Sequence, residues 1–135
     1  MRISTKGRYA LRLMLDLAQH EADGFISLKD VSERQGITVK YLEQIVTSLT
    51  REGLLKSHRG KTGGYQLNRA PEEYRVGDIL RALEGKLVPV ACLVNTPNRC
   101  ERSNECITLP FWSGLSQQIN DYVDRYTLQD ILDGK

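Results

Sequence analysis

The stretch from residue 27 to residue 64 constrains the fold of this chain most strongly, because it joins two short amphipathic segments through a glycine. We predict one helix over 28–35 and a second over 39–51, with Gly36 as the left-handed residue between them. Two helices joined by a short glycine-containing turn form a helix-turn-helix, whose second helix enters the major groove of DNA. An ordinary helical hairpin with a solvated polar face would show the same pattern.

The predicted second helix has one apolar face and one polar face. Its apolar residues recur at spacings of three and four, which predicts a buried stripe: Val39, Leu42, Ile45, Val46 and Leu49. The first two turns of the polar face carry the candidate DNA contacts: Lys40, Tyr41, Glu43 and Gln44. A carboxylate there accepts a hydrogen bond from cytosine N4 but is repelled by phosphate, so it would reject wrong sites.

A glycine-rich hairpin is predicted directly after these helices. Residues 54–58 and 65–67 read as two short strands, and the turn between them carries Arg59 and Lys61. After a helix-turn-helix such a hairpin is a wing, whose cations reach phosphates or the minor groove. A plain hairpin with solubilising charges is the alternative, but the combination of motifs is more specific than either part.

The charge distribution agrees with a DNA-facing first half. Residues 1–70 hold 12 lysines and arginines against 7 aspartates and glutamates, whereas residues 71–135 hold 7 against 10. Basic residues gather at the start of a first helix predicted over 5–20, where they are natural phosphate contacts or solvated surface charges: Arg2, Lys6, Arg8 and Arg12. We therefore expect a DNA-binding module that carries a second, acidic module.

A long C-terminal helix is predicted to begin near Ile107, after a helix over 76–84 and an irregular stretch. Its apolar residues form a narrow seam that little else in the chain can cover, so pairing with a second subunit is the economical solution. Packing against the first helix is the alternative, and both can occur together. The predicted dimer residues are Trp112, Leu115, Ile119 and Tyr122.

The fold class predicted from these elements is mainly α. It comprises a winged helix-turn-helix DNA-binding domain over 1–85, a cysteine-containing sensor loop over 86–106, and a long dimerisation helix with a short terminal helix over 107–135. The chain has no membrane-length apolar run and no signal peptide, and its odd number of cysteines argues against a disulfide framework, so we expect a cytoplasmic protein. No nucleophile–base pair, C-x-x-C or phosphate-binding loop points to an enzyme.

Three cysteines, Cys92, Cys100 and Cys106, lie in or at the edge of the irregular stretch with the spacing C-x7-C-x5-C. Three thiols in one polar loop indicate a metal or cluster site, or redox-active thiols. The spacing matches neither the close pairs of structural zinc sites nor the ferredoxin pattern, so it leaves the metal undecided.

Five stretches of the chain, which together span most of its length, carry a resemblance to a known family: MRISTKGRYAL, SERQGITVKYLEQI, RGKTGGYQL, VGDILRALEG and LPFWSGLSQQI. They resemble the IscR/CymR-type family of bacterial winged-helix transcription regulators. The resemblance implies a homodimer with crossing C-terminal helices, bound to palindromic double-stranded promoter DNA. It places Tyr41, Glu43 and Gln44 in the recognition helix and Arg59 in the wing.

The resemblance also implies an iron–sulfur cluster, [2Fe–2S] or [4Fe–4S], held by Cys92, Cys100 and Cys106, and regulation of cluster assembly or iron homeostasis. Leu109 stands where cluster-binding relatives have a histidine ligand, and the first cysteine spacing is longer. The fourth ligand is therefore open, with these candidates besides a partner residue or a small thiol: Glu101, Asn104 and Glu105. A cluster-free repressor of the CymR type, which senses cysteine or redox state through thiols, zinc or a partner protein, is the alternative.

Overall fold

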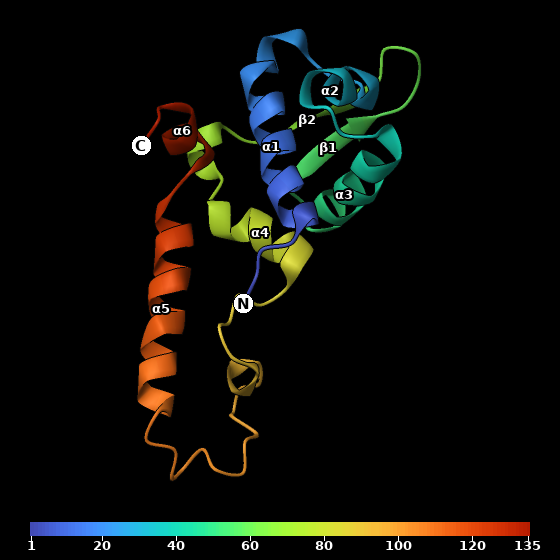
Figure 1. Cartoon of the computed structure of the whole chain (residues 1–135). Coiled ribbons are helices and arrows are strands. Elements are labelled where there is room, and N and C mark those ends of the chain that lie inside the picture. The colour runs from blue at the N-terminus through green and yellow to red at the C-terminus, as the bar shows by residue number, and fades with distance from the viewer.

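The computed structural model describes all residues from 1 to 135. Its elements, in chain order, are α1 (Thr5–Gln19), η1 (Glu21–Asp23), α2 (Leu28–Gln35), α3 (Val39–Arg51), β1 (Leu55–His58), β2 (Gly64–Leu67), η2 (Pro71–Glu73), α4 (Val76–Glu84), η3 (Ala91–Leu93), α5 (Leu109–Arg125) and α6 (Leu128–Leu132). In Figure 1 α1 to α4 gather around the hairpin, α5 extends away from this body, and α6 returns to it. The predicted mainly α fold with a wing is confirmed.

Local capping explains where the helices of the helix-turn-helix begin and end. The hydroxyl of Ser27 accepts a hydrogen bond from the backbone N–H of Asp30, and that of Thr38 accepts one from Tyr41. Gly36, at φ 68°, ends α2 in the left-handed conformation that glycine adopts without strain. The predicted bounds of α2, α3 and α4 are confirmed.

The hairpin is a two-stranded antiparallel sheet whose register pairs Leu55 with Leu67 and His58 with Gly64. An isolated antiparallel bridge between Ile26 and Tyr65 places a third segment beside this hairpin. A side chain at Gly64 would overlap the backbone of Ile26, so glycine lets the two segments approach.

The main hydrophobic core lies between α1, the helix-turn-helix, α4 and the hairpin. In Figure 1 α1 stands between the hairpin on one side and α6 on the other. Leu42, Ile45, Val46 and Leu49 of α3 are buried in it as predicted. Val39 is the exception to the predicted stripe, because it is 38% exposed at the first position of the helix.

α6 belongs to the main core although α5 does not. Leu128 is fully buried there, and the chain before it is tied to the region preceding α4 by hydrogen bonds from Leu128 N to Tyr74 O and from Val76 N to Tyr126 O. The proposed separate unit over 107–135 therefore contributes a core residue to the winged part.

α5 packs chiefly on α4. Val76, Leu80 and Leu87 form a second small core, against which Ile119 and Val123 of α5 lie, and Leu11 of α1 lies against the same small core. No residue of α5 is buried, and the helix begins at Leu109, two residues later than predicted, which leaves Ile107 94% exposed. No helix is both long and apolar enough to span a membrane.

Candidate nucleic-acid interface and cysteine segment

The polar face of α3 is open to solvent near its N-terminus. Lys40, Glu43 and Gln44 are exposed, as a DNA-reading surface requires. Tyr41 is half-buried, because its ring packs edge-on against that of Tyr9 in α1, with the centroids 5.6 Å apart. The structure therefore anchors the first turn of α3 to α1 through Tyr41.

The start of α1 carries Arg2, which is exposed, and Lys6, which is half-buried. The backbone N–H and the hydroxyl of Ser4 donate hydrogen bonds to the carboxylate of Glu84 at the end of α4. A carboxylate suits the positive end of a helix dipole, so this contact fixes the beginning of α1 against α4.

Arg12, one of the four basic residues predicted as phosphate contacts, is exposed, but its guanidinium is hydrogen-bonded within the protein. Its Nε lies 3.2 Å from Oε1 of Gln35, and its Nη2 donates to the backbone carbonyl of the same residue. Its guanidinium also lies over the ring of Tyr9. Arg12 therefore joins α1 to the end of α2, a role that its position in a basic cluster did not indicate.

The wing places Arg59 and Lys61 at its exposed tip, between β1 and β2. The hairpin turn is tight, because a side chain at Gly63 would overlap the carbonyl oxygen of His58. The ring of His58 lies 5.3 Å from that of Phe25, which supports the exposed face of the hairpin. The two cations are thus presented on a supported loop.

Tyr74 holds the base of the wing and was not identified from the sequence. Its side chain is 1% exposed, and its hydroxyl donates to the carbonyl of Leu54 at 2.8 Å and accepts from the backbone N–H of Asn68 at 2.9 Å. Burial is the main reason that the pKa of Tyr74 lies above its ordinary value. The hydroxyl therefore stays neutral and ties the two ends of the hairpin together.

The three cysteines lie in the segment that joins α4 to α5, which runs down to the far end of α5 and turns there (Figure 1). All three are free; Cys92, in η3, and Cys106 are half-buried, and Cys100 is exposed. No three histidine, cysteine or acidic side chains lie close enough together to hold a metal ion. The structure does not bring the three predicted ligands together.

The chemistry of this donor set nevertheless fits a thiolate-bound group. The segment holds only one short helical turn, so little regular structure opposes its rearrangement. Sγ of Cys106 lies 3.2 Å from the hydroxyl of Thr108, and this hydrogen bond is the main reason that the pKa of Cys106 lies below its ordinary value. A lowered pKa favours the thiolate, which is the form that binds metals and reacts with oxidants.

A polar joint connects this segment to α4 and α5. Arg81 of α4 makes a two-pronged ion pair with Asp124 of α5, at 2.8 and 2.9 Å, and its Nη2 also reaches Oδ1 of Asn120 at 2.7 Å. The amide of Asn120 donates to the carbonyl of Leu87, at the start of the cysteine segment. Gly77 permits the close approach, because a side chain there would overlap Asp124.

α1 carries a buried charged side chain, Asp16. Asp16 is 1% exposed and accepts hydrogen bonds from Arg34 and Gln35 at the end of α2. Although burial would raise the pKa of Asp16, the hydrogen bonds from Arg34 and Gln35 outweigh it and lower the pKa. One sequence feature could have identified Asp16 as a buried charge: it interrupts an otherwise apolar run in α1.

The predicted dimer residues divide between two sides of α5. Leu115 and Tyr122 are 38% and 55% exposed, beside Phe111 at 65%, whereas Trp112 and Ile119 are half-buried. The exposed members recur at helical spacing and form one apolar face. Ile119 instead turns toward the small core on α4.

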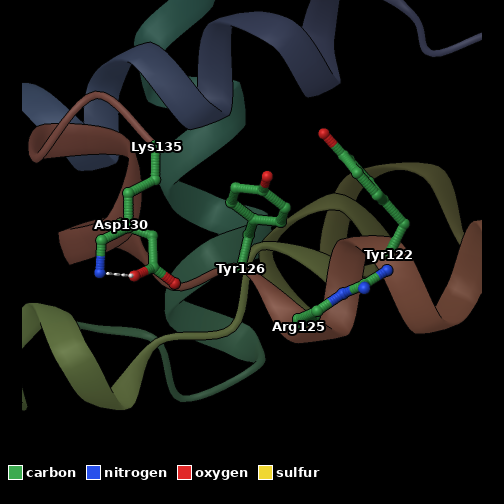
Figure 2. A pocket seen from close by; sticks show the side chains of 5 residues that line it. All are labelled: Tyr122, Arg125, Tyr126, Asp130 and Lys135. Atoms are coloured by element: carbon green, nitrogen blue, oxygen red, sulfur yellow. Dashed lines mark hydrogen bonds and ion pairs between the residues drawn. The ribbon is translucent and has the colours of Figure 1, made fainter.

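A hollow of about 250 Å³ lies at the C-terminal end of α5, and Figure 2 shows the side chains that line it. Tyr126 lies between Tyr122 and Arg125 on one side and the ion pair of Asp130 and Lys135, 3.4 Å apart, on the other. The guanidinium of Arg125 lies over the ring of Tyr122. The charged groups of the hollow thus have partners within the junction of α5 and α6.

Comparison with known proteins agrees with this architecture. The model of the Rrf2 family, described as an iron-dependent transcriptional regulator, matches residues 3–134. The chain is 38% identical to the HTH-type transcriptional regulator IscR of Pectobacterium carotovorum, over 100% of this chain and 81% of that protein.

Two solved structures extend the likeness to three dimensions. The IscR structure of T. potens has a TM-score of 0.78 at 40% identity and covers 99% of this chain and 88% of its own. CymR, the global cysteine regulator of B. subtilis, has a TM-score of 0.81 at 36% identity, with coverage of 100% and 98%. The relatives are transcription regulators, a class of protein distinct from enzymes. The chain belongs to the Rrf2 family of transcriptional regulators and has the winged-helix DNA-binding fold of the IscR and CymR structures.

Proposed function

We propose that this protein is a homodimeric regulator that binds palindromic promoter DNA under the control of an iron–sulfur cluster on Cys92, Cys100 and Cys106. Its regulated process would be iron–sulfur cluster assembly or iron homeostasis. One observation carries the proposal: three free thiols share a single irregular segment in a chain similar to IscR over its whole length.

The DNA-binding surface in this proposal comprises three sets of side chains. The N-terminal part of α3 reads base edges in the major groove, the wing tip contacts the adjacent backbone or minor groove, and the start of α1 contacts phosphate. The residues, in that order, are Lys40, Tyr41, Glu43 and Gln44; Arg59 and Lys61; Arg2 and Lys6. The exposure of Glu43 supports its role in rejecting sites that lack a base-edge donor.

The dimer in this proposal forms through the exposed apolar face of α5, with Trp112 and Ile119 at its margins. Phe111, Leu115 and Tyr122 stay 65%, 38% and 55% exposed within the protomer, and a second copy of the same face would cover them. Leu115→Glu is expected to convert the dimer to a monomer in analytical ultracentrifugation. Glu33→Gln, a charge change on the exposed side of α2, serves as the control. A dimeric Leu115→Glu protein at micromolar concentration would contradict this interface.

The cluster would be held by the three thiolates, with the fourth position filled by Glu101, Asn104, Glu105, a partner residue or a small thiol. When bound, a cluster of either type supplies a centre that is sensitive to oxidants and to iron supply. Leu109 at the start of α5 offers no ligand atom. A set with one weak ligand favours ready loss of the group, as a sensor requires.

The chain's own contacts provide a route from this segment to the DNA-binding surface. Leu87 begins the segment and is held by Asn120, which also contacts Arg81. Arg81 belongs to α4, whose last residue, Glu84, holds the start of α1. A change in the order of the cysteine segment would therefore reach α5 and α4 together and shift the DNA-binding half relative to the dimer helix.

The cluster proposal is tested by purifying the protein without oxygen. We expect visible absorbance together with iron and acid-labile sulfide, and loss of all three in Cys92→Ala. Ser103→Ala, from the same segment, is the matched control and should keep them. Wild-type protein that stays colourless and iron-free after reconstitution would refute the cluster.

A thiol sensor without a cluster is the second candidate, and two observations favour it. Cys106 carries a hydrogen bond that favours its thiolate, and the fold is also that of CymR, a cysteine regulator. Such a protein would lose or gain DNA affinity on oxidation of its thiols while containing no sulfide. Metal and sulfide analysis on the same sample separates the two candidates.

A further inference from the structure

Asp16 is the one charged side chain among the buried residues of this protein. It lies in α1 beside Leu13, Met14 and Leu17, which are all buried in the main core. A carboxylate in such surroundings is costly unless its oxygens are hydrogen-bonded and its charge is paired.

Both oxygens of Asp16 are used to hold the last turn of α2. Arg34 donates from Nη2 to Oδ1 at 2.7 Å and from Nε to Oδ2 at 3.0 Å, and the amide of Gln35 donates to Oδ2 at 3.0 Å. His20 of the following turn lies 3.8 Å from Oδ1. The two-pronged arrangement fixes both the distance and the direction of Arg34.

Gln35 is also held from a second point on α1. Arg12, one turn before Asp16, contacts the side-chain oxygen and the backbone carbonyl of Gln35. Gln35 is the last residue of α2, and the next residue, Gly36, starts the turn into α3. Two positions on α1 therefore fix the point at which the helix-turn-helix bends.

The same contacts continue into the first turn of α3. The guanidinium of Arg12 lies 5.3 Å from the ring centre of Tyr9, and Tyr9 packs edge-on against Tyr41 at 5.6 Å. The end of α2 and the beginning of α3 are thus held by one connected set of contacts with α1. We call four of these side chains the α1–α2 clamp: Arg12 and Asp16 of α1, and Arg34 and Gln35 of α2.

Stability alone is a poor reason for the clamp. The carboxylate of Asp16 is buried, whereas the side chain of Arg34 is 35% exposed. Replacing an ion pair of this kind by well-packed apolar residues is often neutral or stabilising, because apolar groups avoid the cost of removing the buried charge from water. What apolar packing lacks is direction, whereas a two-pronged carboxylate–guanidinium pair specifies orientation. Orientation matters most where a helix must present side chains to base edges.

We propose that Asp16 is a positioning residue for DNA recognition: through the α1–α2 clamp it sets the direction in which the first turn of α3 meets the bases, without touching DNA itself. The inference rests on the proposed DNA-binding surface of α3. A positioning role of this kind should affect sequence-specific binding and leave non-specific binding unchanged. Base-edge contacts depend on the orientation of α3, while phosphate contacts from flexible cations tolerate small rotations.

The test compares two DNA duplexes of equal length: one selected by the wild-type protein from a random-sequence library, and one with the same bases scrambled. Asp16→Asn keeps the size of the side chain but removes its charge and one acceptor. Glu21→Gln, an exposed change in η1, is the matched control for charge. Affinity for both duplexes and its salt dependence are measured by fluorescence anisotropy on folded protein.

We expect Asp16→Asn to lose about 10- to 100-fold in affinity for the selected duplex, the range of one or two good base contacts. Affinity for the scrambled duplex should change by less than about 2-fold, and the salt slope should stay the same, because phosphate contacts are unchanged. Glu21→Gln should match the wild type on both duplexes.

One result would overturn the inference: an unchanged ratio of selected to scrambled affinity in folded Asp16→Asn, whether the two affinities are kept or are lost equally. If Asp16→Asn does not fold, the double change Asp16→Leu with Arg34→Met supplies an apolar replacement, and wild-type selectivity in that variant would refute the clamp equally. A wild-type protein that selects no sequence at all contradicts the proposed DNA-binding function instead.

Discussion

Adding one carbon atom at Gly77 should break the joint between α4 and α5. A side-chain Cβ there would overlap Oδ1 of Asp124 and lie 2.8 Å from Nη1 of Arg81 and 3.0 Å from Cγ2 of Val123. Gly77 sits inside α4, where alanine normally gains up to about 1 kcal/mol over glycine. Oδ1 of Asp124 and Nη1 of Arg81 are the ends of side chains that can move, so the steric intrusion should cost about 1 kcal/mol, the low end for a packed contact. Displacement of the partly exposed ion pair adds about 0.5 kcal/mol.

The net expectation for Gly77→Ala is therefore a loss of about 0.5–1.5 kcal/mol, or about 2–5 °C in melting temperature. Thermal denaturation followed by circular dichroism measures it, at one protein concentration because dimerisation links stability to concentration. Gly114→Ala in α5, where a Cβ would meet no atom within 4 Å, is the control and should be neutral or stabilising.

The same substitution in an Asp124→Ala protein tests whether Asp124 is the source of the penalty. With Asp124 shortened to alanine, the added carbon at Gly77 no longer meets a fixed carboxylate, so most of its penalty should disappear. A Gly77→Ala protein as stable as the wild type would refute the close-packed joint. A penalty that persists undiminished in the Asp124→Ala background would show that the ion pair is not its source.

Three further expectations concern the wing and the buried polar groups. Tyr74→Phe should cost about 1–3 kcal/mol in urea denaturation, because it removes the partner of the buried Leu54 carbonyl, and an unchanged free energy of unfolding would contradict that contact. Lys61→Ala should reduce the slope of log affinity against log salt by about 1, and an unchanged slope would remove the wing tip from the phosphate contacts. The folded state lowers the pKa of Asp16, so its stabilisation is complete above the unfolded value of about 3.9 and is lost as pH falls through the folded value. Wild-type protein should therefore lose more stability than Asp16→Asn between about pH 4.5 and pH 2; equal losses would contradict the lowered pKa.

The parts of the fold that could be predicted depend on neighbours in the sequence. The helix-turn-helix was located because its caps and turn are local: Ser27 and Thr38 accept hydrogen bonds three residues onward, and Gly36 needs no distant partner. The wing followed from a glycine-rich turn between short strands for the same reason.

The unpredicted features depend on residues far apart in the chain. Asp16 meets Arg34 across 18 positions, and Arg81 meets Asp124 across 43. A pattern of spacing cannot pair such residues, because several other charges stand at equivalent helical positions. The seam of α5 was located by its periodicity, but the side on which Ile119 packs depends on α4.

The cysteine segment could be predicted only in part. Its position and its three thiols follow from the sequence, whereas the arrangement of the thiols does not, because the segment has almost no regular structure to place them. The ligand set therefore stays a proposal that rests on the chemistry of Cys92, Cys100 and Cys106 and on the family.

Control of DNA binding by the cluster is measured most directly as the DNA affinity of one anaerobic preparation before and after iron chelation, on the duplex selected by the wild-type protein. We expect visible absorbance, iron and sulfide at the outset, and a change in affinity of at least about 10-fold when they are removed, which corresponds to about 1.4 kcal/mol of coupling. Equal affinity in the two states, with the absorbance demonstrably present and then lost, would contradict control by the cluster.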